Sequence, residues 1–160
     1  MFKKSQLAMT DLFISIAIFI ILIVAIIISW NTYSIRLKDR IIYDDMLYNA
    51  YQITDLLVNS QGEPSNWNYS NVQVIGLAHN DHNISTNKLN ALYNLSYSKS
   101  KELFNIERYE FYLQITNSSN YNLVNPYGNI SIPSSEDVTK IRRYVIYENK
   151  EAVLQLTIWQ

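Results

Sequence analysis

A run of apolar residues from Leu12 to Trp30 constrains this chain more than any other feature of its sequence. Its only polar members are Ser15 and Ser29. As a helix of roughly 19 residues, the run would extend about 28 Å, which matches the hydrocarbon core of a bilayer. A single domain of this size could not surround a helix that is apolar on every side. The run therefore predicts a membrane-spanning helix over residues 12–30.

The same run differs from a cleaved secretory signal. It is longer than the core of about 7–15 apolar residues found in signal peptides, and no small-residue cleavage site follows it. Trp30 and Tyr33, at its end, are typical of the aromatic belt at a membrane–water interface. We therefore expect the helix to remain on the chain as a single membrane span.

Charged residues flank the span on both sides. Lys3 and Lys4 precede it and further basic residues follow it, so positive charge alone leaves the orientation open. The region after the span is rich in Asn, Ser and Tyr and contains N-x-[ST] triplets, the acceptor pattern for N-glycosylation. We therefore expect the N-terminus inside, with Lys3 and Lys4 contributing to the topology, and the C-terminal region outside. The candidate glycosylation sites are Asn68, Asn83, Asn94, Asn117 and Asn129.

The composition excludes several functional classes. The 13 Lys+Arg and 14 Asp+Glu give a net charge of −1, so no basic field favours nucleic acid as a partner. The chain has no cysteine, and its 3 glycines form neither a phosphate-binding loop nor a G-x-S-x-G nucleophile turn. We therefore predict that the protein is not an enzyme and needs no cofactor.

One cluster, His79-Asn80-Asp81-His82, carries side chains that could ligate a metal. Asn and Asp in such a run are typical of turns, however, and no second cluster of ligands accompanies it. We therefore predict a surface turn at these residues and no metal site.

The helix is expected to continue beyond the membrane. No Gly or Pro occurs from Tyr33 to Val58, and Gly62 and Pro64 then form a strong stop signal. Apolar residues in this part recur at helical spacing, which predicts an amphipathic helix that packs one face on the rest of the chain. The stripe consists of Ile42, Met46, Ala50, Ile53 and Leu57.

The residues after this helix predict a small α+β head. Ser85 is placed to cap a short helix that runs through Leu95. Alternating or aromatic-rich segments then predict three strands, with a shorter extended segment at 72–75, and Glu148–Glu151 forms the turn between the last two strands. An antiparallel sheet of three to four strands should pack on the amphipathic half of the long helix. The three predicted strands are Tyr109–Thr116, Ile141–Tyr147 and Ala152–Trp159.

The beginning of the chain resembles the class III-type signal sequence and core helix of archaeal type IV prepilins. Lys3-Lys4 is followed by Ser5-Gln6, by an acid at Asp11 and by the uninterrupted apolar helix. In that family a membrane aspartyl peptidase cuts before a glutamine, and an acid follows shortly after the cut. The resemblance implies cleavage between Ser5 and Gln6. The chain differs from the common family pattern at two positions. Ser5 stands where the family more commonly has glycine. The acid is an aspartate, Asp11, one place later than the glutamate of the best-known pattern.

A second region, comprising residues 52–67, 74–78 and 84–89, is similar to archaeal pilin-like proteins. The resemblance implies a structural subunit, a major or minor pilin, of a type IV surface filament. Its implied partners are copies of itself or sibling pilins, the prepilin peptidase, membrane lipid, and an assembly ATPase with its membrane platform. It also implies a location in the cell membrane before assembly and in an extracellular filament afterwards, where the subunit would serve surface display such as adhesion.

Asp11 has two interpretations. In a filament it would pair with the new amine at Gln6 of a neighbouring subunit, which would offset desolvation and fix the stagger between helices. Alternatively, it would only cap the membrane helix at the inner interface, where a negative charge favours the positive end of the helix dipole.

These inferences divide the chain into a leader at 1–5, a long helix at 6–59 and an extracellular head at 60–160. Two alternatives to a filament subunit stay open. One is a signal-anchored single-pass protein whose external domain binds a partner and never polymerises. The other is a membrane-tethered hydrolase. An intact N-terminus on the native protein would favour the anchor.

Overall fold

The computed structural model describes the backbone of residues 2–134 and 138–160, with side chains from Met9 onward. The chain divides into two compact units, one ending at Ile42 and the other beginning at Tyr43. The elements are α1 (Phe2–Asn59), β1 (Ala78–Asn80), β2 (Asn83–Ile84), α2 (Thr86–Tyr93), α3 (Tyr97–Leu103), β3 (Glu110–Thr116), β4 (Tyr127–Gly128), β5 (Val138–Tyr147) and β6 (Lys150–Trp159).

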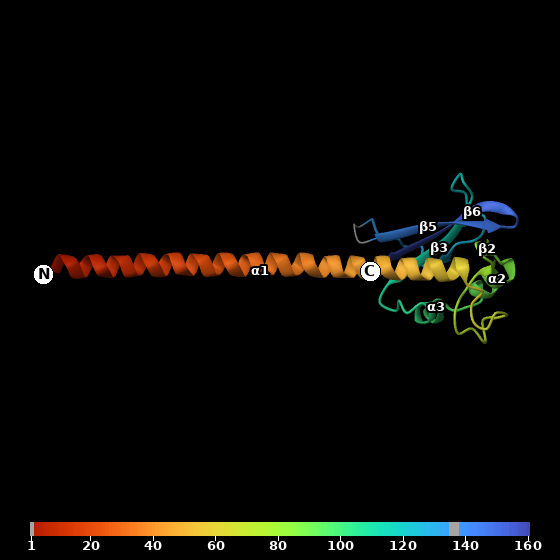
Figure 1. Ribbon diagram of the computed structural model, residues 1–160, viewed down its shortest axis with the longest axis horizontal. Coiled ribbons are helices and arrows are strands. Elements are labelled where there is room, and N and C mark those ends of the chain that lie inside the picture. Colours follow the sequence, from red (N-terminus) through yellow and green to blue (C-terminus); the bar gives the residue numbers. More distant parts are fainter. Residues whose placement is uncertain (1, 135–137) are drawn as a thin grey trace. The chain divides into compact units, whose positions relative to one another are not determined.

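Helix α1 contributes to both units (Figure 1). Its membrane-compatible part is one helix with a mean hydropathy of 3.3 over the best 18-residue window, and none of that window is buried. The helix ends at Asn59, directly before the stop signal that contains Gly62 and Pro64. Its backbone is helical from Phe2, whereas the side chains of Lys3, Lys4, Ser5 and Gln6 lie outside the described part of the structure.

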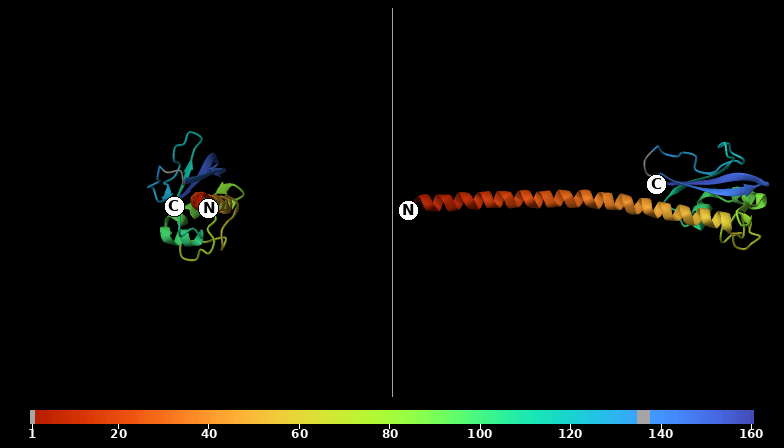
Figure 2. Two further views of the ribbon diagram at one scale, coloured as in Figure 1. Left: turned by 90° about the vertical axis from the view of Figure 1, so that its left-hand side faces the viewer. Right: turned by 45° about the horizontal axis from the view of Figure 1, so that its top comes forward.

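The second unit is built around the last four turns of α1. Met46, Ala50 and Leu57 are fully buried and Ile53 is 3% exposed, so these four residues of the predicted stripe lie in the core of the head. Ile42, the first residue of that stripe, is half-buried and belongs to the first unit. The sheet lies along one side of this part of α1, and α3 lies on the other side (Figures 1 and 2). The helix therefore serves as a core element of the head.

The sheet has six strands in the order β1-β2-β5-β6-β3-β4 and is mixed, because β2 pairs with β5 in parallel. The expected antiparallel sheet of three to four strands is correct only for the central strands β5, β6 and β3, which pair antiparallel. The added strands β1, β2 and β4 have two or three residues each. Segments this short cannot show an alternating pattern, so the sequence gives no signal for them.

The hairpin of β5 and β6 is longer than predicted. Its turn is only Glu148-Asn149, and both residues have positive φ, 49° and 60°. This conformation matches the twist of two antiparallel strands and allows a two-residue turn. Ten residue pairs therefore join Val138–Tyr147 to Lys150–Trp159, beyond the expected start of β5 at Ile141.

The single helix expected after Ser85 is two helices. Ser85 precedes α2, but its side chain makes no capping hydrogen bond. Ser96 instead starts α3, where its Oγ accepts a hydrogen bond of 3.3 Å from the Lys99 N–H. Ser96 thus satisfies the Lys99 N–H, which has no partner within the helix at a helix start. This cap favours a new helix after Ser96 over continuation of α2. The extended segment expected at 72–75 is reduced to a single bridge between Val74 and Glu63.

Candidate interaction surfaces

The first unit presents an apolar surface on all sides of α1 between Leu12 and Trp30. Ile23 is 39% exposed and Ile21 67%, and the other large apolar side chains of this segment lie in a similar range. At about 25 cal/mol per Å² of apolar surface, leaving this many large side chains in water would cost tens of kcal/mol. This surface therefore requires lipid or other helices as its surroundings.

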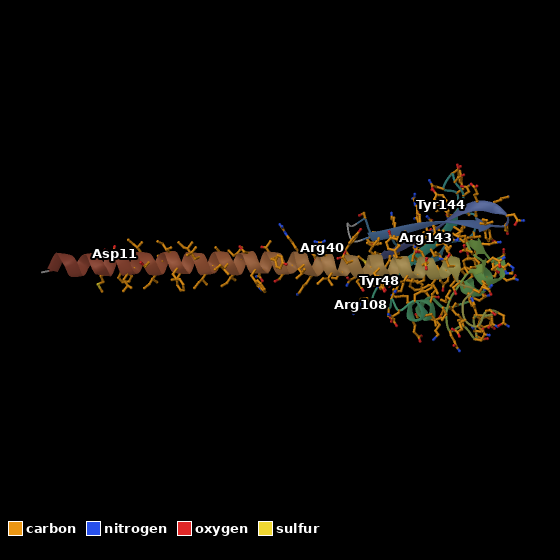
Figure 3. The ribbon with its side chains drawn as sticks, viewed as in Figure 1. Asp11, Arg40, Tyr48, Arg108, Arg143 and Tyr144 are labelled. Carbon is orange, nitrogen blue, oxygen red and sulfur yellow. The ribbon has the colours of Figure 1, made fainter. Side chains whose placement is uncertain are left out.

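Asp11 is exposed on the first unit (Figure 3). The Ser15 hydroxyl donates a hydrogen bond of 2.8 Å to the Asp11 backbone carbonyl. Asp11 lies in the third turn of α1, which begins at Phe2, whereas a capping residue stands at the helix start. In the uncleaved chain Asp11 therefore occupies an interior position of α1, away from the helix start, and its side chain is exposed.

An aromatic pair marks the end of the apolar segment. Trp30 and Tyr33 are 68% and 60% exposed, and their ring centroids are 6.5 Å apart. Exposed basic side chains follow on the same helix, at Arg36, Lys38 and Arg40. Aromatic rings followed by basic side chains are typical of the boundary between hydrocarbon and lipid headgroups.

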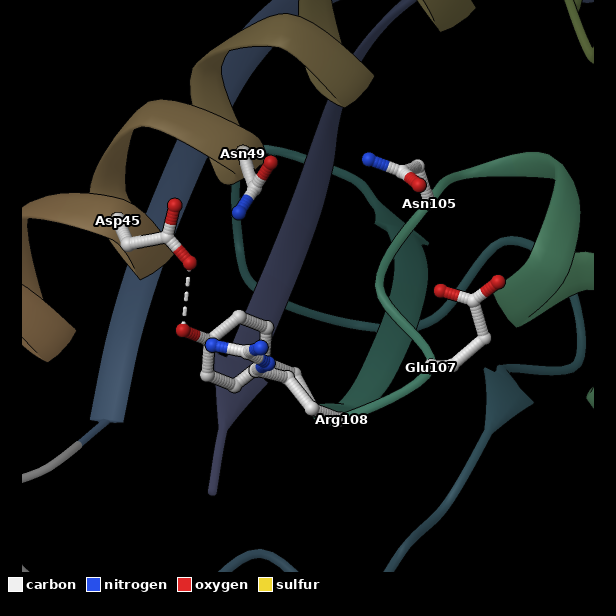
Figure 4. A pocket seen from close by; sticks show the side chains of 6 residues that line it. Asp45, Asn49, Asn105, Glu107 and Arg108 are labelled. Atoms are coloured by element: carbon white, nitrogen blue, oxygen red, sulfur yellow. Dashed lines mark hydrogen bonds between the residues drawn. The ribbon is translucent and has the colours of Figure 1, made fainter.

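A polar pocket of about 510 Å³ lies between the α1 part of the head and the loop before β3 (Figure 4). The buried Tyr109 hydroxyl donates a hydrogen bond of 2.6 Å to Oδ2 of Asp45 across the pocket. Burial raises the pKa of Tyr109, Asp45 raises it further, and Arg108 opposes both. The hydrogen bond thus fastens the loop to the helix. No sequence motif marks these residues. The pocket is lined by Asp45, Asn49, Asn105, Glu107, Arg108 and Tyr109.

A second polar group joins α3 to β3 and to Asn129, the residue after β4. Glu110 accepts hydrogen bonds from Lys101 (2.8 Å) and Tyr97 (2.7 Å), and one of 3.2 Å from Asn129 Nδ2. Burial would raise the pKa of Glu110, but these hydrogen bonds outweigh it and the pKa is lowered. The charged Glu110 carboxylate therefore connects three segments of the head.

Three half-buried tyrosines of the head, Tyr93, Tyr97 and Tyr127, predict that its stability depends on pH in the alkaline range. Burial, with a contribution from Tyr147, raises the pKa of Tyr93 to about 12, and burial also raises the pKa of Tyr97 and of Tyr127. The folded head binds these phenol protons more tightly than the unfolded chain, whose tyrosines have a pKa of about 10. Their stabilising contribution is therefore complete below about pH 10 and is lost as the pH rises through the folded pKa values.

We expect the free energy of unfolding to fall between about pH 9 and about pH 12, in step with tyrosinate absorbance. Urea denaturation across this range would measure it. Tyr93→Phe should reduce the decline, whereas Tyr69→Phe, at a tyrosine that is 62% exposed, should leave it unchanged. An unfolding free energy that stays constant over this range would contradict the expectation.

The five N-x-[ST] triplets differ in accessibility. Asn68 and Asn94 are exposed, whereas Asn83, Asn117 and Asn129 are half-buried. Asn68 Oδ1 accepts hydrogen bonds from the N–H and the hydroxyl of Ser70, which brings the two essential residues of that triplet together. Asn129 Nδ2, the atom that would carry a sugar, is instead bonded to Glu110.

We therefore expect glycopeptide mass spectrometry of the native protein to find higher occupancy at Asn68 than at Asn129. Attachment at Asn129 would displace its hydrogen bond to Glu110, whereas attachment at Asn68 displaces no described contact of its Nδ2. The reverse ranking would contradict the accessibility argument. Five unmodified sites would remove the support that the triplets give to an external head.

His82 lies in the turn that joins β1 to β2, whereas His79 is the middle residue of β1, so the predicted surface turn covers only Asp81 and His82. His82 has a positive φ of 58°, and its Nδ1 is 2.8 Å from Oδ1 of Asp81. No group of three or more His, Asp or Glu side chains with metal-binding geometry occurs among the described residues.

Comparisons with protein-family models, with curated proteins and with solved structures found no match to this chain. The resemblance to prepilins therefore depends on the residues named in the sequence.

Proposed function

We propose that the protein is a pilin-like structural subunit of an archaeal type IV filament, assembled through α1 after removal of residues 1–5. The observation that carries the proposal is the contrast between the two parts of α1. Its first part exposes apolar side chains in all directions, and its last turns are the core of the head. Such a helix suits storage in a bilayer followed by packing among copies of itself, where lipid contacts are exchanged for helix contacts.

In this proposal Asp11 forms an ion pair between neighbouring subunits. A carboxylate inside hydrocarbon costs on the order of 2.5–3.5 kcal/mol at the bilayer centre and less near the interface. Cleavage before Gln6 would create a positive amine, and that amine on a neighbouring subunit could pair with Asp11. Such a buried pair contributes more to the register between helices than to net stability.

The proposal places the chain in the membrane as a single span, with the N-terminus inside and the head outside, until it enters the filament. It requires sibling or identical pilins, a prepilin peptidase, and an assembly ATPase with its membrane platform. A signal anchor would need the same span but neither the cut before Gln6 nor the acid at Asp11.

One measurement on native material and one on a variant test the proposal. Intact-mass analysis should find a chain that starts at Gln6, shorter by only the first five residues. A chain that starts at Met1 or Phe2 would instead indicate a permanent anchor. Loss of the whole apolar segment would indicate an ordinary secretory signal.

Asp11→Ala should leave cleavage largely intact and reduce filament number, because the peptidase acts before the carboxylate meets a neighbour's amine. Asp39→Ala is the matched control, since Asp39 is another exposed acid on the first unit. Filaments should be counted by electron microscopy, with total protein measured in parallel. Normal filaments from Asp11→Ala would remove the pairing role.

A further inference from the structure

Strand β5 leaves most of one edge without a backbone partner. Its ten residues pair with β6 on one side, but on the other side β2 reaches only Ile146 and Tyr147. Among the described residues, no backbone hydrogen bond joins Val138–Val145 to anything except β6. This edge of β5 therefore carries no described backbone hydrogen bond over most of its length; Figure 2 shows the hairpin of β5 and β6 in blue.

The pairing of β5 with β6 determines which backbone N–H and C=O groups of β5 point toward its open edge. In an antiparallel pair, successive residues of one strand turn their N–H and C=O groups alternately toward and away from the partner. Ile146 turns its N–H away from β6, because that group donates a hydrogen bond of 2.7 Å to the His82 carbonyl. By the same alternation Lys140, Arg142 and Tyr144 also turn their N–H and C=O groups to the open edge.

Side chains beside the edge differ between the two faces. Lys140, Arg142 and Tyr144 are exposed on the outer face, where Tyr144 is 84% exposed. Arg143 alternates to the inner face, and its guanidinium lies 5.5 Å from the ring centroid of Tyr51 on α1 (Figure 3). An added strand would thus meet two cations on its outer side, and on its inner side the apolar Ile141 and Val145 with Arg143 between them.

A second copy of this chain fits the edge poorly. Pairing β5 with the β5 of another copy would bring Lys140 and Arg142 close to the same cations, which is unfavourable. The strands at the ends of the sheet, β1 and β4, have only three and two residues. Charged side chains on an edge strand are a common means of preventing such self-pairing.

We propose that the β5 edge binds an extended acidic segment of a different protein by strand addition. The main-chain groups of Lys140, Arg142 and Tyr144 would form the ladder, and acidic side chains at alternate positions would lie beside the two cations. Apolar residues at the positions between would face inward. This proposal concerns the head alone and does not depend on filament assembly.

The test uses the full-length chain in detergent micelles and a synthetic heptapeptide that alternates glutamate with valine. We expect saturable binding by calorimetry and slower amide hydrogen exchange at Lys140, Arg142 and Tyr144. The same peptide with lysine in place of glutamate should not bind. Binding of the acidic peptide without protection of these amides would overturn the proposal, since it would show charge attraction only.

A proline variant separates the backbone from the side chain. Arg142→Pro removes the edge N–H but no hydrogen bond to β6, because that N–H points away from β6. Arg142→Ala removes the same side chain and keeps the N–H. We expect binding to be at least about tenfold weaker in the proline variant than in the alanine variant.

Equal affinities for these two variants would also overturn the proposal. The pair Tyr144→Pro and Tyr144→Ala repeats the comparison one step along the edge. It keeps the test decisive if Arg142→Pro fails to fold, which circular dichroism would reveal.

Discussion

Replacing Gly76 with alanine should lower the free energy of unfolding of the head by about 3 kcal/mol or more. A methyl group at this position would lie well inside van der Waals contact of the backbone of Gly62 and of Ser60. Neither neighbour is a flexible side chain that can move aside. The Gly76 carbonyl also accepts a hydrogen bond of 2.9 Å from Trp67 Nε1, so a shift of this loop would disturb a buried tryptophan.

Thermal or urea denaturation of the full-length chain in micelles measures this effect. Asn66→Ala is the control in the same loop, because Asn66 is exposed and its replacement should change stability by less than about 0.5 kcal/mol. A Gly76→Ala variant as stable as the Asn66→Ala variant would show that the loop has room to move.

Leu57→Ala and Leu22→Ala should have very different effects, although both remove the same atoms from the same helix. Leu57 is fully buried in the head, and its truncation should cost about 2–5 kcal/mol of unfolding free energy. Leu22 is 56% exposed in the first unit, so its truncation should change head stability by less than about 0.5 kcal/mol. Denaturation followed by tryptophan fluorescence would compare them. Similar losses would mean that the first unit contributes to the stability of the head.

The elements that the sequence could predict are those whose pattern of residue types continues over many successive positions. The long apolar helix and its end before Gly62 follow from residue type alone, because many successive residues agree. The central strands β3, β5 and β6 were predictable for the same reason, as buried residues alternate along most of each strand.

Features that depend on a few residues or on tertiary contacts were not predictable. The parallel pairing of β2 with β5 involves two residue pairs, and no local pattern records it. The division of one expected helix into α2 and α3 depends on the choice of Ser96 over Ser85 as a cap. The hydrogen bond between Tyr109 and Asp45 joins residues 64 positions apart, so only the fold brings that pocket together. The roles of Ser5, Gln6 and Asp11 stay predictions, since they concern a peptidase and neighbouring subunits.

The sharing of α1 between the two units has a mechanical consequence. Because α1 contains no Gly or Pro and no loop separates the units, a pull on its first part is transmitted directly to Met46, Ala50 and Leu57 in the core of the head. Tension cannot be absorbed by extending a linker. Separating the head from the helix would require rupture of its hydrophobic core, so the head should resist force as a single cooperative body and fail abruptly.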